Sequence, residues 1–474
     1  MNFDNIKQAQ RSQENWWQQL MGGSSSSRPL RAEQAGLQWH LDYPSQNRPI
    51  KLAPGGIVVL GWVLLPPSLG DYIGAVEVVA RWSEPFEVAH PLNVERSDVV
   101  ERVLGANADD HPQRRCGFRF TIPHTTKAFE LELLIQGERL SLERVIIDSD
   151  APEGDPLPPL KVLEGKEGWL FLDNDTNGSV DQYCGNMRLT EKGVTQWQRY
   201  LQGFASLALK HRAKTALLIS PSKESVMGPC YHPMKEGLSG PIHQLLALPE
   251  ASSFLYPVGA LRALGDDAFI RTDSHWTSRG AMAAVQELAK AFDFDQSEVG
   301  ATFAEDEYQS RTFPGDLGSK FDPVRTCTTD VLCSFSYLQH RYFDNGLPNF
   351  GRLLLVTYPN ALRAATCVMF GSSSSYFMLN YLSRLFSRVV FVHTAGNLDP
   401  ELIAAIKPEY LVVQTNARFV VQVPKTRQAL SALIEDKRAR LTPAEQELLT
   451  KRQVSVNEND SLIETLGLSP WVSL

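Results

Sequence analysis

The sequence predicts two domains of different class: an all-β, sandwich-like domain followed by an α/β domain whose parallel sheet is flanked by helices. Short apolar runs between turn residues fill the first third of the chain, and strand-like runs alternate with amphipathic helices in the rest. The proline-rich stretch APEGDPLPPL separates the two patterns. We therefore expect a flexible helical, glutamine-rich segment at 1–29, the β domain at 30–150, a linker at 151–160, the α/β domain at 161–423 and a charged helical tail at 424–474.

The β domain is expected from five short apolar runs with glycine and proline between them. Alternation of apolar and polar residues in FELELLI and GFRFTI is typical of half-buried antiparallel strands. The five expected strands cover residues 56–65, 75–82, 116–123, 128–135 and 140–148.

The α/β domain is expected from a regular alternation of elements. Helices are predicted near 190–211 and at 278–292, 375–386 and 398–406, and strands at 215–220, 367–370, 389–393 and 410–415. Strands and helices at this spacing form βαβ units with a parallel sheet. In the tail, Thr442 and Glu445 form a capping-box pattern that starts a helix, and we assign this tail no chemistry.

Composition and charge narrow the function classes. The 474 residues carry a formal net charge of −8 with dispersed lysines and arginines, which argues against nucleic-acid binding. The longest strongly apolar run, at 56–65, is about half of the ~20 residues that a membrane span needs, so no stable membrane insertion is expected. The first residues lack the pattern of an export signal, and none of the six cysteines forms a CxxC pair. We therefore expect a cytoplasmic location, reduced thiols and no metal site.

Four consecutive serines, at 372–375, follow an expected strand at the edge where open α/β sheets bind ligands. A second run, at 24–27, follows no strand, so consecutive serines alone indicate little. A serine nucleophile needs a histidine base, and the base needs an orienting carboxylate. Asp273 and His275 lie two residues apart and supply both. Taken singly, these residues also fit a turn serine, a buried imidazole and a helix-capping aspartate.

Four motifs resemble one known family. GKEGWLF at 165–171, PSKES at 221–225, the Asp-x-His-Trp at 273–276 and GSSSS at 371–375 occur in this order in a region that resembles the SGNH-hydrolase-like domain of alginate O-acetyltransferases, the AlgX/AlgJ family. The resemblance covers roughly residues 160–420. It implies an SGNH-hydrolase-like parallel sheet and acyl transfer, usually of acetyl groups onto polysaccharide hydroxyls.

The resemblance also implies site residues. Ser373 matches the family's nucleophile, His275 its general base and Asp273 the orienting residue. Backbone N–H groups at 372–376 are expected to supply part of an oxyanion hole. The family segment reads Gly-[Asp/Thr]-Ser-[Tyr/Phe]-Ser, whereas this chain has serine at 372 and 374, so register alone selects Ser373. The relatives act in the periplasm, which differs from the location expected here.

Further candidates for oxyanion or substrate contacts have plainer alternatives. Ser372 and Ser374 flank the expected nucleophile. Trp276 is expected to pack under its loop, and Lys223 to form a structural ion pair rather than bind substrate. The last two candidates are Asp316 in the turn FPGDLG, which a plain β-turn explains equally well, and Arg418, for which a surface position is expected.

The sequence therefore predicts a serine-dependent O-acyltransferase, most simply an O-acetyltransferase, that acts on a polysaccharide or glycan through an acyl-enzyme. With water as the acceptor the protein is an esterase, and with a drifted nucleophile segment it is a glycan-binding or scaffold protein without activity. No cofactor is expected. The expected partners are a carbohydrate substrate, an acyl donor and other polysaccharide-synthesis proteins. The acyl group, its donor and the glycan stay open.

Overall fold

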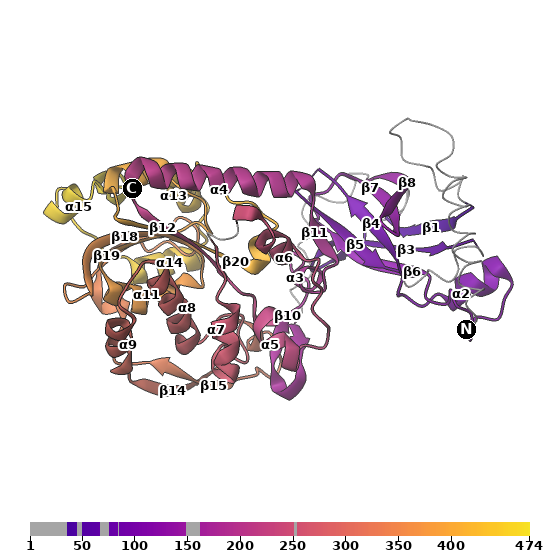
Figure 1. The fold of residues 1–474 in the computed structure, drawn as a ribbon, viewed down its shortest axis with the longest axis horizontal. Coiled ribbons are helices and arrows are strands. Elements are labelled where there is room, and N and C mark those ends of the chain that lie inside the picture. The colour runs from indigo at the N-terminus through magenta and orange to yellow at the C-terminus, as the bar shows by residue number, and fades with distance from the viewer. Residues whose placement is uncertain (1–35, 45–49, 67–74, 84, 148–161, 251–253) are drawn as a thin grey trace. The chain divides into compact units, whose positions relative to one another are not determined.

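The chain divides into two compact units (Figure 1). The computed structural model describes residues 36–44, 50–66, 75–83, 85–147, 162–250 and 254–474. One unit holds residues 1–161 and 174–190, and the other holds 162–173 and 191–474. The expected N-terminal segment at 1–29 and the linker at 151–160 lie outside the described residues.

The first unit contains two antiparallel sheets. In one, the strand β3 (Gly56–Leu64) pairs with β1 (Gln38–Tyr43), β2 (Leu52–Ala53) and β6 (Gly117–Ile122). The other has the order β11 (Met187–Leu189), β5 (Phe86–Pro91), β4 (Val76–Arg81), β7 (Ala128–Ile135) and β8 (Glu138–Ile146). Alternation has its expected effect in β7, where Phe129, Leu131, Leu133 and Ile135 are all buried.

Residues 174–190 join this first unit, although the sequence pattern placed them in the α/β domain. They form the short helix α3 (Ser179–Tyr183) and β11, which pairs with β5. A three-residue strand has no periodicity that a sequence pattern can reveal. The structure therefore differs from the expected division, because the chain returns to the β unit once more after residue 173.

The second unit is built on a seven-stranded sheet. Its order is β13 (Phe254–Leu255), β12 (Lys214–Ser220), β20 (Tyr410–Asn416), β18 (Arg363–Gly371), β19 (Phe386–His393), β17 (Leu353–Thr357) and β16 (Arg341–Asp344). The first five are parallel, and β17 and β16 extend the sheet in the antiparallel sense. The four strands expected from sequence are β12, β18, β19 and β20, at the centre of this sheet.

Helices cover both faces of the sheet (Figure 1). The helices α8 (Ser278–Ala291) and α11 (Ser375–Leu385) pack on each other and share a buried core with one face, while α4 (Glu191–His211) and α12 (Pro400–Ile406) pack together elsewhere on the unit. The Thr277 hydroxyl caps α8 by accepting a hydrogen bond from the Gly280 amide, which fixes where this helix begins after the Asp-x-His segment. The helices α4, α8 and α11 lie within one residue of the positions expected from the sequence at each end.

The C-terminal residues are helical, as expected, but they are part of the α/β unit. They form α13 (Leu430–Ala439), α14 (Pro443–Arg452), α15 (Ser461–Thr465) and α16 (Ser469–Val472), and the capping box of Thr442 and Glu445 is present. Val454 pairs with Asp344 of β16, and the Leu430 amide donates to the carboxylate of Asp399. The expected boundary at 423 is therefore not a boundary between compact units.

The remaining α-helices and β-strands complete the described part of the chain. They are α2 (Ser97–Val99), β9 (Val162–Glu164), β10 (Leu170–Leu172), α5 (Lys223–Tyr231), α6 (Pro241–Leu246), α7 (Val258–Ala263), α9 (Gln296–Ala304), β14 (Tyr308–Phe313), α10 (Gly315–Gly318) and β15 (Cys327–Leu332). In the described part of the chain, no helix combines the length and the apolar character needed to cross a bilayer.

Candidate active site

The four serines form the turn between β18 and α11. The strand β18 ends at Gly371 and the helix begins at Ser375, so the turn lies at the carboxyl end of a central parallel strand. A Cβ at Gly371 would overlap the Ser375 hydroxyl and the Phe391 ring, so glycine leaves the space that these side chains occupy. Of the four serines only Ser373 is half-buried, and the other three are buried.

The three buried serines are held by the end of the neighbouring strand β20. The side-chain Oε1 of Gln414 accepts hydrogen bonds from the Ser372 amide (2.8 Å), the Ser372 hydroxyl (2.8 Å) and the Ser375 hydroxyl (2.7 Å). The side-chain Oδ1 of Asn416 accepts one from the Ser374 hydroxyl (3.1 Å). These bonds satisfy the buried hydroxyls, which explains the serine run structurally. They also fix the turn and leave the fourth hydroxyl outside this network.

That fourth hydroxyl faces an imidazole. Ser373 Oγ lies 3.0 Å from His275 Nε2, and His275 Nδ1 lies 2.7 Å from Asp273 Oδ1. A carboxylate only accepts hydrogen bonds, so Nδ1 carries the proton and Nε2 is left to accept one from Ser373. The structure thus brings together the three residues that the sequence selected, from two loops 98 positions apart. The arrangement can remove a proton from the serine hydroxyl.

Asp273 is held in its ionised form. Burial of this carboxyl opposes ionisation, but hydrogen bonds from the His275 ring and from the amides of His275 (2.9 Å) and Asp316 (2.8 Å) outweigh it and lower the pKa of Asp273 to about 2. The carboxylate is therefore charged at neutral pH, and it keeps the His275 ring in one tautomer and orientation.

Asp316 belongs to the same hydrogen-bonded group. It lies in the short helix α10, where its exposed carboxylate accepts bonds from the Ser274 amide (2.7 Å) and hydroxyl (2.5 Å). Together with its amide bond to Asp273, these contacts fix the loop that carries the imidazole. Asp316 thus supports the pair of Asp273 and His275, which is more than the plain turn that the sequence allowed.

Trp276 connects the two loops. Its indole is 1% exposed, as expected of a packing residue, and Nε1 donates to the Ser374 carbonyl at 3.0 Å. Lys223 is also buried, and its amine donates to three backbone carbonyls, of Ile270, Arg271 and Asp273. Lys223 therefore bonds to the backbone of the loop at 270–276, which we call the histidine loop, in place of the ion pair that was expected.

Part of the α/β unit is similar to a known protein family. Residues 162–340 match the family model described as "SGNH hydrolase-like domain, acetyltransferase AlgX". The resemblance seen in the sequence is thereby confirmed. The matched region includes Asp273 and His275, whereas Ser373 lies beyond its end.

Several solved structures are similar at low identity. They include the O-acetyltransferase domain of Pseudomonas putida AlgJ (16% identical, covering 62% of this chain and 100% of that chain, TM-score 0.35), Bacillus cereus PatB1 (10%, 55% and 97%, TM-score 0.39) and Pseudomonas aeruginosa AlgX (12%, 56% and 67%, TM-score 0.33). The search of curated proteins found no match. Similarities this low do not assign a function to the chain.

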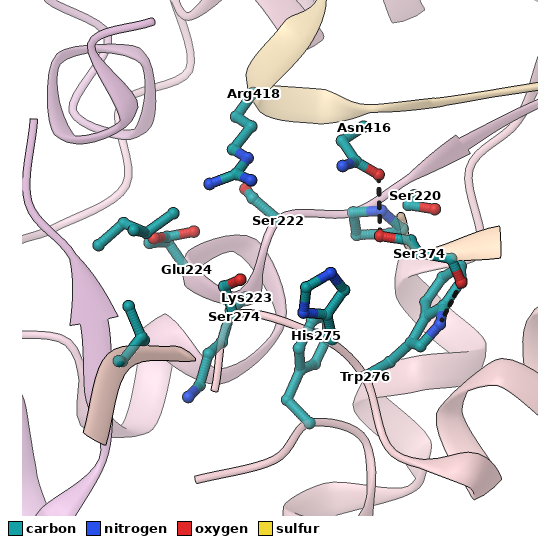
Figure 2. Close-up of a pocket in the computed structure, with 14 residues that line it drawn as sticks. Ser220, Ser222, Lys223, Glu224, Ser274, His275, Trp276, Ser374, Asn416 and Arg418 are labelled. Carbon is teal, nitrogen blue, oxygen red and sulfur yellow. Dashed lines mark hydrogen bonds between the residues drawn. The ribbon is translucent and has the colours of Figure 1, made fainter. Parts of the chain in front are cut away.

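A cavity opens beside the imidazole on the side of Ser374 (Figure 2). Its polar lining includes Ser222, Glu224, Asn416 and Arg418, so Arg418 faces this cavity although a surface position was expected. Figure 2 shows the carbonyl oxygen of Asn416 on Ser374 and the amide nitrogen on the opposite side, towards Ser222 and Arg418. The cavity therefore offers hydrogen-bond donors and acceptors next to the proposed base.

Sequence reasoning missed Gln414 and Asn416. Both follow the apolar run YLVV at the end of β20, where an amide side chain in a buried strand is unusual. Amide side chains at the end of an apolar strand can be noticed in the sequence. That they contact the serine turn at the end of β18 is known only from the fold.

One cluster has ligand atoms close enough to hold a cation. Those of Asp273, His275 and Asp316 lie within 4.8 Å of one another. Each of these groups already has a protein hydrogen-bond partner, and the contacts of Asp273 and Asp316 order the histidine loop. We assign the cluster to positioning.

Gly315 presses against Asp273 and provides a first test. Its φ is +67°, and a Cβ there would lie 2.7 Å from the Cβ of Asp273 and 2.5 Å from the Thr272 carbonyl oxygen. Gly315→Ala is therefore expected to displace the carboxylate, lowering kcat by about 10- to 100-fold and the free energy of unfolding by about 1–3 kcal/mol. Gly300→Ala, in α9 with open space around it, is the matched control. Wild-type rates in Gly315→Ala would show that this contact does not position Asp273.

Proposed function

We propose that the protein is a serine-dependent O-acyltransferase that transfers an acyl group, most simply acetyl, to a carbohydrate hydroxyl. The observation that carries the proposal is the chain of contacts from Ser373 Oγ through the His275 ring to Asp273, at 3.0 and 2.7 Å. The match of residues 162–340 to the model of the AlgX acetyltransferase domain supports acetyl as the group transferred.

The first half-reaction forms an acyl-serine. Ser373 Oγ attacks the carbonyl carbon of the acyl donor while its proton passes to His275 Nε2, and Asp273 stabilises the resulting imidazolium. When the tetrahedral intermediate collapses, the bond to the leaving group breaks and Nε2 returns the proton to that group. In the second half-reaction an acceptor hydroxyl gives its proton to Nε2 and attacks the acyl-serine. The ester forms on the acceptor, and Nε2 returns the proton to Ser373.

The charge on the carbonyl oxygen needs hydrogen-bond donors. The amides of Ser373 and Ser374, at the start of α11, donate to no other described residue, and they are the donors we propose. The amide nitrogen of Asn416 is the third, because three acceptor contacts fix the carbonyl side of that group. Each such donor is typically worth about 3–4 kcal/mol in the transition state.

The acceptor is proposed to enter through the cavity beside His275. Its hydroxyl, amide and guanidinium groups suit a ligand rich in hydroxyls. A carbohydrate fits this chemistry and the acetyltransferase family. The acyl donor, a contact with other polysaccharide-synthesis proteins and a cytoplasmic location stay predictions, and cell fractionation with affinity capture tests the last two.

Two assays test the function. The purified chain is expected to release p-nitrophenol from p-nitrophenyl acetate, and mass spectrometry of an added oligosaccharide panel is expected to show O-acetylation. Release without acetylated sugar would support the esterase. A well-folded chain that releases no p-nitrophenol and reacts with no fluorophosphonate would contradict catalysis and favour the glycan-binding or scaffold alternative.

A further inference from the structure

The Lys223 ammonium is buried beneath the histidine loop. Lys223 begins α5, and its side chain is 3% exposed. Its Nζ lies 2.8 Å from the carbonyl oxygens of Ile270 and Arg271 and 2.9 Å from that of Asp273. An ammonium has three protons, and each has an acceptor here. All three acceptors belong to the segment that leads into the Asp273 and His275 pair.

Aromatic rings also lie close to the ammonium. Nζ lies 5.0 Å from the ring centre of Trp169 and 5.4 Å from that of Phe171, distances at which cation–π attraction contributes. The Leu170 amide also donates to the Arg271 carbonyl at 3.0 Å. The motifs GKEGWLF, PSKES and Asp-x-His-Trp, which are separate in sequence, therefore meet at one charged group.

We propose that Lys223 is a further positioning residue of the acid–base pair: its ammonium holds the three carbonyls in the arrangement that directs His275 at Ser373. This inference rests on the proposed function, because Lys223 changes the reaction rate only by positioning His275. Lys223 is among the residues that line the cavity, but in Figure 2 its amine lies away from Asn416 and Arg418. Its effect is therefore proposed to act through the loop that carries His275.

The three hydrogen bonds from the Lys223 amine to the backbone carbonyls depend on pH. Burial lowers the pKa of Lys223 from 10.5 to about 7, against the influence of the surrounding groups Glu224, Asp273, Asp316 and Cys327, which favour the charged form. A neutral amine has two N–H donors for three carbonyls, so at least one of these hydrogen bonds is lost as the pH rises above about 7.

Stability changes in the opposite direction. Because the folded pKa lies below the unfolded one, the cost of burying the charge is fully present below pH 7 and fades as the pH rises towards 10.5. Loss of alignment together with gain of stability above pH 7 separates a positioning role from a merely structural one.

Lys223→Met removes the ammonium and keeps the apolar stem. The rate of fluorophosphonate labelling and kcat are both expected to fall about 100-fold at pH 6.5, with KM for p-nitrophenyl acetate changed less than about threefold. Lys214→Met is the matched control, since this exposed lysine on β12 forms an ion pair with Asp293 and lies outside the site. The control is expected to keep wild-type rates.

A second readout does not need activity. The proton shared by His275 Nδ1 and Asp273 is expected at low field in the proton NMR spectrum of the wild type and to broaden or disappear in Lys223→Met. A folded Lys223→Met variant that keeps this resonance and the wild-type labelling rate would overturn the inference. If the wild type itself shows no chemistry, the proposed function fails while the resonance still decides the role of Lys223.

The wild type provides the test if Lys223→Met does not fold. Lysine labelled with ¹³C at Cε reports the ionisation of Lys223, assigned with Lys223→Arg. The low-field resonance and the labelling rate are expected to decline along that titration. A resonance of the His275–Asp273 proton that stays unchanged while Lys223 loses its proton would contradict the positioning role of Lys223.

Discussion

Ser373→Ala is expected to lower acyl transfer and p-nitrophenyl acetate hydrolysis by at least ~10³-fold, because no other hydroxyl of the serine turn lies against the imidazole. The residual rate is expected to come from binding and from the oxyanion donors. Circular dichroism and thermal melting of the variant are expected to match the wild type, since the Ser373 hydroxyl takes no part in the buried network around Gln414. Steady-state kinetics measure the loss.

The other three serines provide the controls for this result. Ser372→Ala, Ser374→Ala and Ser375→Ala each remove a buried hydroxyl bonded to Gln414 or Asn416, so each is expected to cost about 1–3 kcal/mol of stability. Their rates are expected to fall far less than that of Ser373→Ala. Retained activity in Ser373→Ala combined with loss in one neighbour would move the nucleophile to that neighbour.

Asp273→Asn is expected to lower kcat by about 10⁴-fold. An asparagine amide placed against His275 Nδ1 favours the wrong tautomer, with the proton on Nε2, which then cannot accept from Ser373. The matched control is Asp295→Asn at the cap of α9, which removes a carboxylate outside the site and is expected to keep kcat. Equal kcat in Asp273→Asn and the wild type would exclude this role for Asp273.

The same variant has a pH signature in stability. The pKa of Asp273 is lowered from 3.8 to about 2 in the folded chain, so ionised Asp273 contributes about 2 kcal/mol above pH 4, and this contribution is lost as the pH falls towards 2. The free energy of unfolding of Asp273→Asn is therefore expected to lie below that of the wild type at neutral pH and to approach it in acid. Denaturant titrations at several pH values measure the difference.

Much of the α/β unit was predictable because its central strands are continuous apolar runs. VVFVH and YLVVQT have few alternatives to a buried parallel strand, and the Pro400 start of α12 is visible in sequence. The strand β17 has the equally apolar run LLLV but was missed, since a short run bounded by loops has no helix pattern after it to mark a βαβ unit. The return of residues 174–190 to the first unit depends on pairing with β5, which no local pattern encodes.

The site divides in a similar way. Asp273 and His275 were found because their spacing is local, and Ser373 because the family motif supplied its register. Gln414 and Asn416 act on the serine turn only because β20 lies beside β18 in the sheet, a neighbour relation that sequence order hides. Lys223 was expected in an ion pair, since a lysine bonded to three backbone carbonyls requires tertiary structure to recognise.

The most direct test of the central claim is to find which residue carries the acyl group. The chain is incubated with p-nitrophenyl acetate, quenched in acid and digested, and the acetylated peptide is sequenced by mass spectrometry. We expect a single acetyl ester on Ser373, absent from Ser373→Ala and from His275→Ala. An ester on Ser372, Ser374 or Ser375, or turnover of the ester substrate with no acylated serine, would contradict the account.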